Sequence, residues 1–289
     1  MNSQTDKSAI IAHRTKAGVK RIPQIKNIIA VTSGKGGVGK STTAINLAIS
    51  LFKTGATVGL LDADIYGPSI PMLVGETTYK PGVSNNNFEP LSKFGVQLMS
   101  FGFLIAEAQP TIWRGAMVNK AIQQMLYDTA WDELDYLIMD LPPGTGDIHL
   151  TMAQSMPITA TVVVTTPQDI ALVDVGKSIT MFNKLDIPCL GVIENMATHI
   201  CENCGHLSDI FGYGGSLRLK EEYELSLLAR LPLNLAICQH SDLGKPIATL
   251  KDNPLSKIYQ DLALNVATQL ASLPKDHSSI LSTFSIIKK

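Results

Sequence analysis

The sequence is poor in cysteine and in aromatic residues, and it contains no long apolar run. Four cysteines in a chain of 289 residues are too few for the disulfide framework of a small secreted protein, and they fit a reducing compartment. No stretch of about 18 apolar residues is present, which excludes a membrane-spanning helix. The N-terminus also lacks the apolar core of a signal peptide. We therefore expect a cytoplasmic protein without stable attachment to a membrane.

Net charge is nearly absent as well, because 24 basic residues face 25 acidic ones. Such a balance creates no overall field for a polyanion, so we expect no nucleic acid partner. The basic residues are unevenly placed, since residues 1–26 carry six of them against Asp6 alone. With 45% hydrophobic and 17% charged residues, the chain fits a compact α/β domain. We predict a flexible basic arm over residues 1–26, the domain over residues 27–273 and a tail over residues 274–289.

One glycine-rich segment dominates the sequence. Residues 34–41 read Gly-Lys-Gly-Gly-Val-Gly-Lys-Ser and match the phosphate-loop pattern G-x-x-x-x-G-K-[ST] at every fixed position. The segment lies between an apolar, β-branched run and apolar residues at helical spacing, which is the strand and helix context that the pattern needs. Lys40 is expected to reach the β- and γ-phosphates of ATP, and the Ser41 hydroxyl to bind Mg²⁺. The predicted nucleotide-binding residues of this segment are Gly34, Lys35, Gly36, Gly37, Val38, Gly39, Lys40, Ser41 and Thr42.

Two further apolar runs end in carboxylates. Residues 57–61 lead into Asp62 and Asp64, and residues 136–139 lead into Asp140. Ligands bind at the carboxyl ends of strands in an open α/β sheet, where these side chains would gather. Asp140 has the Walker B position, which supports the Mg²⁺ shell, and we assign to Asp64 the orientation of the attacking water, with Asp62 as the alternative. Capping of a loop is the purely structural alternative for Asp62 and Asp64.

Three residues beyond the loop complete the expected nucleotide site. The N–H of Gly144 is a candidate sensor of the γ-phosphate, because it follows Asp140 in a loop of prolines and glycines. Asn195 follows a buried strand, where its amide can read the adenine edge, and Pro232 is assigned to nucleotide binding as well. We predict a doubly wound, mainly parallel sheet with helices on both faces. Its strands are expected at residues 28–32, 57–61, 96–100, 136–140, 161–165, 189–193 and 227–233.

Cys201 and Cys204 form a C-x-x-C pair on a loop that contains a glycine. The spacing directs two thiolates to one centre, as zinc or an iron–sulfur cluster requires, whereas a thioredoxin-like redox pair belongs to a different topology. The pair supplies only two of four ligands, and Cys189 and Cys238 are poor candidates for the rest. His199 and His206 would complete a zinc site within one chain. Alternatively, the same cysteines of a second chain would complete a four-thiolate site on a two-fold axis.

Taken together, these motifs resemble the Mrp/ApbC-type iron–sulfur cluster carriers, a branch of the deviant Walker A ATPases, which include MinD and ParA. Lys35 is the second lysine typical of that larger group. The run Asp-Leu-Pro-Pro-Gly-Thr-Gly-Asp at residues 140–147, combined with the C-x-x-C pair, indicates the branch. Many relatives carry a small additional domain, for which the first 26 residues leave no room, and Ala116 stands where they often have proline. Other matching segments are residues 62–69, 113–115, 166–169, 194–196 and 201–215.

The resemblance implies a homodimer that holds a [4Fe–4S] cluster between Cys201 and Cys204 of both chains. It also implies ATP hydrolysis coupled to transfer of the cluster to apo iron–sulfur proteins, with Lys35 reaching the partner's nucleotide. The catalytic residues are then Lys35, Lys40, Asp64 and Asp140, and the cofactors are ATP and Mg²⁺. Two other functions remain open: a MinD/ParA-like positioning or partition ATPase, for which the cysteine pair has no purpose, and a zinc-stabilised nucleotide switch. The tail carries apolar residues at helical spacing, and we expect it to pack on its own domain rather than on a membrane.

Overall fold

The computed structural model describes residues 10–16, 18–105 and 115–276. Three predicted features lie outside these ranges: the first nine residues of the basic arm, the pair Trp113 and Arg114, and the C-terminal residues 277–289. Within the described ranges, no helix combines the length and the apolar character needed to cross a membrane.

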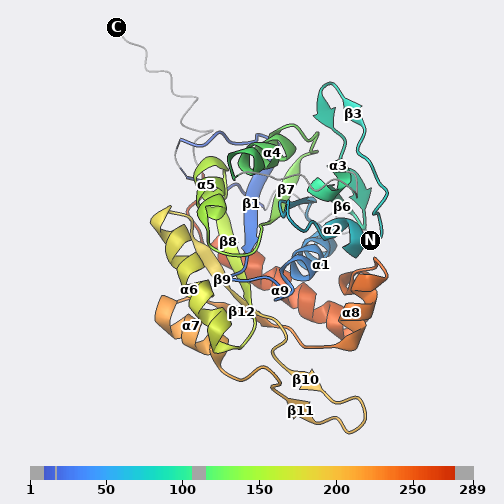
Figure 1. Cartoon of the computed structure of the whole chain (residues 1–289), viewed down its shortest axis with the longest axis vertical. Helices are drawn as coiled ribbons and strands as arrows, with labels where there is room; N and C mark the ends of the chain where they lie inside the picture. Colours follow the sequence, from blue (N-terminus) through green and yellow to red (C-terminus); the bar gives the residue numbers. More distant parts are fainter. Residues whose placement is uncertain (1–9, 17, 106–114, 277–289) are drawn as a thin grey trace, which may run out of the picture.

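A central sheet of eight strands runs through the domain (Figure 1). Neighbouring strands follow the order β12-β9-β8-β1-β7-β2-β6-β5, and all neighbours are parallel except β5, which is antiparallel to β6. The chain extends this sheet in both directions from β1, so the doubly wound, mainly parallel fold predicted from the sequence is confirmed. The strands are β1 (Ile25–Thr32), β2 (Val58–Asp62), β5 (Leu91–Lys93), β6 (Val96–Ser100), β7 (Leu134–Asp140), β8 (Ala160–Thr165), β9 (Cys189–Glu194) and β12 (Leu227–Arg230).

Helices cover both faces of this sheet, as Figure 1 shows. Helix α1 packs on β1, β2 and β7 and pairs with α9. Helices α4 and α5 pack together, and α6 and α7 pack on each other and on β9. Right-handed crossovers that run in opposite directions along the sheet place α1 and α9 on one face and α4, α5, α6 and α7 on the other. The helices are α1 (Lys40–Lys53), α2 (Ile70–Leu73), α3 (Phe101–Leu104), α4 (Gly115–Tyr127), α5 (Asp147–Ser155), α6 (Asp169–Lys184), α7 (Gly215–Tyr223), α8 (Leu235–Asp242), the 3₁₀ turn η2 (Ile247–Thr249) and α9 (Pro254–Ala271).

The register of the sheet aligns three strand ends. Val31 in β1 pairs with Asp140 in β7, and Asp140 pairs on its other side with Asp62 in β2. Every residue of β2 and β7 is buried, because helices cover both faces, and this explains their continuous apolar runs. The loops that follow these strands therefore meet at one edge of the sheet.

The described part of the predicted arm contacts the domain. His13 is buried, and both its backbone N–H and its Nδ1 lie within 3.0 Å of Asn27 Oδ1 in β1. Arg21 forms an ion pair with Asp276, and His13 forms an isolated antiparallel bridge with Lys275. These contacts join the two ends of the described chain. The boundaries at residues 26 and 274 stay predictions.

Two hairpins lie outside the main sheet. The sequence suggests irregular structure over residues 75–93, but β3 (Val83–Ser84) and β4 (Asn87–Phe88) pair there, with positive φ at both turn residues, Asn85 and Asn86. This backbone suits a two-residue hairpin, and asparagine tolerates it. A second hairpin, β10 (His199–Ile200) with β11 (Leu207–Ser208), projects from the body of the molecule (Figure 1).

Candidate functional site

The glycine-rich loop connects β1 to α1 and ends in a left-handed backbone. Gly37 and Gly39 have φ values of 80° and 81°, which glycine adopts without strain. A Cβ at Gly39 would lie 2.2 Å from Asn195 Nδ2, so this position also lacks room for a side chain. Helix α1 begins at Lys40, and its first N–H groups lack partners within the helix. The loop and the helix N-terminus thus form a site for phosphate.

Lys40 and Asp140 form a buried ion pair beside this loop. Lys40 Nζ lies 2.6 Å from Asp140 Oδ1 and 3.3 Å from Ser41 Oγ. Burial raises the pKa of Asp140, and the Lys40 ammonium opposes that rise. Asp140 Oδ2 is buried with no hydrogen-bond partner. An unsatisfied carboxylate oxygen near a serine hydroxyl is a donor set that suits Mg²⁺, so the residues fit the predicted metal.

Asp62 and Asp64 occupy different environments. Asp62 is fully buried and accepts hydrogen bonds from the Ser100 hydroxyl and the N–H of Ile70. Burial raises its pKa to about 7, and the charge of Asp140 adds to the rise. Asp64 lines the cavity described below, where its Oδ1 accepts the N–H of Gly67 at 3.3 Å. The geometry therefore favours Asp64 over Asp62 as the carboxylate that faces a ligand.

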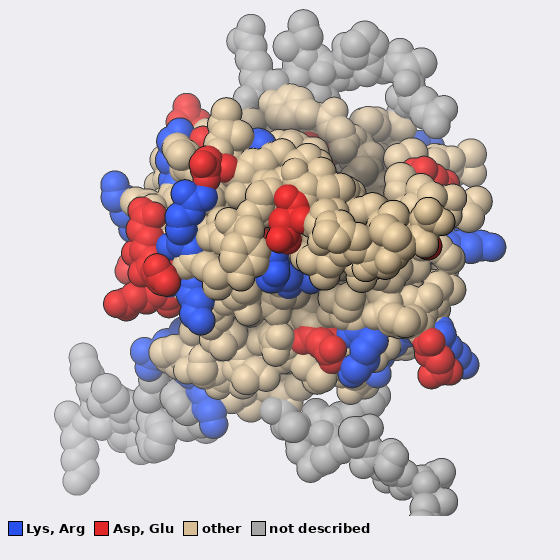
Figure 2. Space-filling view, turned by 90° about the horizontal axis from the view of Figure 1, so that it is seen from below, with Lys and Arg blue, Asp and Glu red and all other residues tan. Residues whose placement is uncertain are grey.

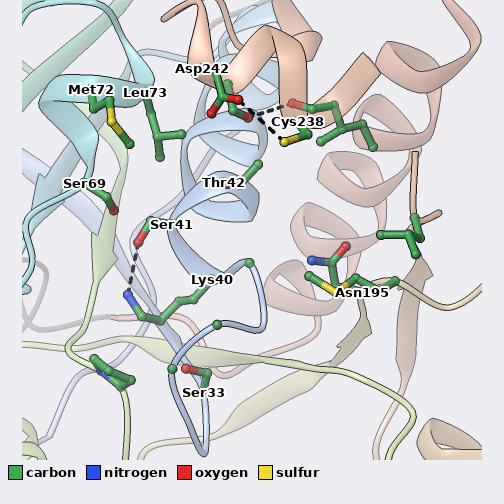
Figure 3. Close-up of a pocket in the computed structure, with 18 of the residues that line it drawn as sticks. Ser33, Lys40, Ser41, Thr42, Ser69, Met72, Leu73, Asn195, Cys238 and Asp242 are labelled. Carbon is green, nitrogen blue, oxygen red and sulfur yellow. Dashed lines mark hydrogen bonds between the residues drawn. The ribbon is translucent and has the colours of Figure 1, made fainter. Parts of the chain in front are cut away.

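A cavity of about 480 Å³ lies over the loop, which is within the usual range for small-molecule sites. Figure 3 shows Met72 and Leu73 on one side of α1 and Asn195 on the other, with Cys238 and Asp242 above them. Of the predicted residues, the cavity is lined by Lys35, Gly36, Gly37, Gly39, Lys40, Ser41, Thr42, Asp64, Asn195 and Pro232. It is also lined by residues for which the sequence offers no motif: Met72, Leu73, Leu233, Ile237, Cys238, Ser241, Asp242 and Tyr259.

The other predicted residues support this cavity from outside. Gly34 packs so closely that a Cβ there would lie 2.6 Å from Asp174 Cβ. The Val38 carbonyl accepts a hydrogen bond from Asn195 Nδ2 at 2.8 Å, which holds this amide beside the loop. The Gly144 N–H donates to the Ser33 carbonyl at 2.9 Å, so a role as phosphate sensor requires this bond to open.

Two further side chains border the loop: Lys35, which the sequence predicts as a site residue, and His149, which it does not. The Lys35 ammonium lies 3.4 Å from Oε1 of Gln168, the residue before α6, and it pairs with no carboxylate among the residues that the structure describes. His149 in α5 has no sequence signal, yet it is buried and its Nε2 donates to the Pro142 carbonyl at 2.7 Å. Burial lowers the pKa of His149 and thereby favours the neutral ring. This imidazole fixes the loop that follows Asp140.

The C-x-x-C pair lies at the tip of the β10–β11 hairpin, away from the cavity. The N–H of Gly205 donates to the Cys201 carbonyl, and the N–H of Cys201 donates to the His206 carbonyl, which closes a tight turn. Hydrogen bonds from the N–H groups of Cys204 and Asn203 lower the pKa of Cys201, and the Cys204 thiol adds to the effect. Backbone N–H groups directed at a sulfur atom stabilise a thiolate, which is the form that binds metal.

The other cysteines lie elsewhere. Cys189 is in β9, where burial raises its pKa to about 11, and Cys238 is exposed in α8 with its Sγ 3.7 Å from Asp242 Oδ2. Across the described ranges, no three His, Cys, Asp or Glu side chains are grouped to hold a metal ion. The structure therefore does not assemble the single-chain zinc site with His199 and His206, and Cys201 and Cys204 stand as a pair of free thiols without a third ligand in those ranges.

Known proteins share this sequence and architecture. The chain is 51% identical over 259 residues to an iron–sulfur cluster carrier protein of Pseudomonas fragi, covering 88% of this chain and 90% of that protein. It is 43% identical over 259 residues to the mouse iron–sulfur cluster transfer protein NUBPL, covering 89% and 81%. The carrier protein of Escherichia coli K12 is 50% identical over 248 residues, which cover 85% of this chain and 67% of that protein.

Solved structures agree with these relatives. A nucleotide-binding protein from Archaeoglobus fulgidus in complex with ADP superposes with a TM-score of 0.69 at 39% identity, covering 79% of this chain and 90% of that chain. The cell division ATPase MinD of Pyrococcus furiosus shares the fold, with a TM-score of 0.62 at 21% identity over 84% of this chain and 98% of that chain. The profile of the ParA/NUBPL iron-transfer P-loop NTPases matches residues 24–267. This chain therefore belongs to the iron-transfer P-loop NTPases of the ParA/NUBPL family.

Proposed function

We propose that this protein is an ATP-dependent carrier that binds a [4Fe–4S] cluster between two copies of the chain and transfers it to apo-proteins. The observation that carries this proposal is the exposed hairpin that presents the Cys201 and Cys204 thiols together, without a third ligand in the described part of the chain. A cubane cluster needs four thiolates, and a two-fold axis supplies them from two identical pairs. The names of the relatives as cluster carriers and transfer proteins support cluster delivery as the function.

The surface around the hairpin supports association of two copies. Four large apolar side chains of the hairpin and the following loop are exposed, namely Ile200, Leu207, Ile210 and Tyr213. Figure 2, which views this end of the molecule, shows a broad area with few charged side chains. An apolar area next to metal-binding thiols is suited to burial against a partner, which also shields the cargo from water.

The cavity supports ATP hydrolysis by residues of this chain. The N–H groups of the loop and of the first turn of α1 bind phosphate oxygens, and Lys40 neutralises charge on the transferred phosphoryl group. Ser41 and Asp140 would hold Mg²⁺, which neutralises charge between the β- and γ-phosphates. Asp64 orients the attacking water. Lys35 has no carboxylate partner among the described residues, and it extends to the nucleotide of the second chain. Asn195 and Pro232 border the adenine.

Anaerobic reconstitution of the full chain with iron and sulfide tests the proposal. The expected result is a brown protein with labile sulfide, one four-iron cluster for two chains, and a dimer in sedimentation. A colourless protein that binds only zinc would instead indicate the zinc-stabilised switch. Transfer of the reconstituted cluster to an apo-ferredoxin, faster with ATP than without it, tests the delivery step. We also retain a cytoplasmic location in the proposal, because all four cysteines are free thiols.

A further inference from the structure

The cysteine hairpin is attached to the domain by two stems, and the first of them begins at Asn195 and Met196 in the wall of the nucleotide cavity. The first stem runs from the end of β9 to β10 and is paired with the segment that follows β12. The Ala197 N–H donates to the Leu231 carbonyl at 2.9 Å, and the Leu233 N–H donates to the Thr198 carbonyl at 2.8 Å. Leu233 lines the cavity, and Thr198 directly precedes the hairpin.

The second stem follows β11 and is attached through one arginine. Arg230 Nε donates to Glu194 Oε2 at 2.7 Å, and Arg230 Nη2 lies 3.5 Å from Asp209 Oδ1, next to β11. The Arg230 guanidinium also lies over the Tyr213 ring, 5.3 Å from its centre. Glu194 Oε1 accepts the N–H of Ser216 at the start of α7. One guanidinium thus connects a buried carboxylate of the sheet to the stem that leaves the hairpin.

Glu194 and Arg230, which hold the second stem, lie close in sequence to residues that line the cavity. Glu194 immediately precedes Asn195, and Arg230 is two residues before Pro232, and both Asn195 and Pro232 line the cavity. The Glu194 side chain is 1% exposed, so its charge holds Arg230 in place, because a buried carboxylate without a partner is strongly unfavourable. The planar fork of arginine can serve Glu194 and Asp209 together, which the single ammonium of lysine does poorly.

We propose that Arg230 is a positioning residue that couples the nucleotide cavity to the Cys201 and Cys204 hairpin, an inference that rests on the proposed function. A nucleotide that displaces Asn195 or Pro232 displaces the Glu194–Arg230 pair with them. Because Asp209 is paired with Arg230, it moves with the Glu194–Arg230 pair. The stem that follows Cys204 then shifts relative to the stem that precedes Cys201. The relative placement of the two thiols then depends on whether the cavity is filled.

The rate of alkylation of each cysteine tests this coupling in the full-length protein without a cluster. Iodoacetamide labelling is followed by peptide mass spectrometry, with and without magnesium and a non-hydrolysable ATP analogue. Cys238 lines the cavity, so slower labelling of Cys238 reports independently that nucleotide is bound. Asp209→Asn removes the charge on the hairpin stem but leaves the Glu194–Arg230 pair intact. Arg230→Gln removes the connection itself, and Arg218→Gln is the matched control, because it removes an exposed arginine that pairs with Asp169 between α6 and α7.

In the wild type and in Arg218→Gln, nucleotide should change the labelling rate of Cys201 or Cys204 about fivefold or more, the lower range of ordinary coupling between sites. In Asp209→Asn and Arg230→Gln this change should fall below about twofold, while Cys238 stays protected. A full response in Asp209→Asn with Cys238 protected overturns the inference, as does a wild type whose thiols do not respond although Cys238 is protected. Failure of nucleotide to protect Cys238 in the wild type overturns the proposed nucleotide site, and the inference with it.

Discussion

Lys40 Nζ lies 2.6 Å from Asp140 Oδ1, and both side chains are buried at the aligned ends of β1 and β7. This pair joins the phosphate loop to the strand end that is expected to support Mg²⁺. The Lys40 ammonium compensates a carboxylate in the protein interior, and in the proposed function it also lies where phosphate charge develops. The two residues should therefore act together in stability as well as in turnover.

Replacement of Lys40 by alanine should abolish ATP turnover, with a decrease of about a hundredfold or more, because the positive charge that stabilises the transition state is lost. It should also destabilise the fold by roughly 3–5 kcal/mol, since Asp140 is left buried without a partner. Phosphate release and thermal unfolding measure the two effects. The double variant Lys40→Ala with Asp140→Asn is the control, and it should recover stability but not activity. Turnover at the wild-type rate in Lys40→Ala would contradict the phosphate-loop assignment.

Asp62 should make the protein less stable as the pH rises. Burial raises the pKa of Asp62 from 3.8 to about 7, so between these values the folded state holds a proton that the unfolded state releases. The contribution of this proton is present in full below the unfolded pKa and is lost as the pH passes about 7. Without nucleotide or magnesium, unfolding free energy should fall by on the order of a few kcal/mol from pH 4 to pH 8. Asp62→Asn should flatten this slope, and an identical slope in both proteins would refute the assignment.

Asp64 should act on hydrolysis rather than on binding. Its carboxylate lines the cavity, whereas Asp62 is fully buried and bonded to Ser100 and Ile70. Asp64→Asn should keep the affinity for ATP and reduce turnover about a hundredfold or more, in line with the loss of a group that orients and activates water. Equilibrium binding measures the affinity for ATP, and single-turnover hydrolysis measures the chemical step. Unchanged turnover would transfer the role to Asp62 or to another residue.

Gly39 should tolerate a side chain less well than Gly37. Both have a φ near 80°, so alanine at either position carries roughly 1–2 kcal/mol of backbone strain. Only at Gly39 does the new Cβ meet the Asn195 amide, at 2.2 Å, whereas no atom lies within 4 Å at Gly37. We expect Gly39→Ala to be less stable than Gly37→Ala by about 1–3 kcal/mol in chemical denaturation. Adding Asn195→Ala should narrow that gap, and two equally stable variants would show that the contact does not limit the site.

The four cysteines should separate into two classes. Cys201→Ser or Cys204→Ser should prevent cluster assembly while nucleotide binding remains, because the hairpin lies away from the cavity. Cys189→Ser and Cys238→Ser should retain the cluster, which visible absorption and labile sulfide would report. A requirement for Cys189 would exclude a site built from two identical cysteine pairs.

Local patterns alone predicted the doubly wound, mainly parallel sheet and the residues of the expected phosphate site. The strands were predictable because helices on both faces bury every side chain of β2 and β7, which leaves continuous apolar runs in the sequence. The glycines near Lys40 and the carboxylates that end β2 and β7 follow from the same local rules, since parallel strands bring their carboxyl ends to one edge. The C-x-x-C pair was equally visible, because both thiols come from one short turn.

Only the tertiary structure decided which distant residues complete these sites. Met72, Cys238 and Tyr259 reach one cavity from three helices, and no spacing in the sequence records that meeting. The same holds for His149 beneath Pro142 and for Arg230 between Glu194 and Asp209, where each side chain is an ordinary polar residue of its own helix or strand. Such partners are brought together by the packing of the whole chain, which depends on shape and burial. A motif can be recognised in the sequence only when residues close together in the chain bind the same ligand. The sequence therefore predicts the phosphate loop and the pair of thiols, and only the fold brings Arg230 between Glu194 and Asp209.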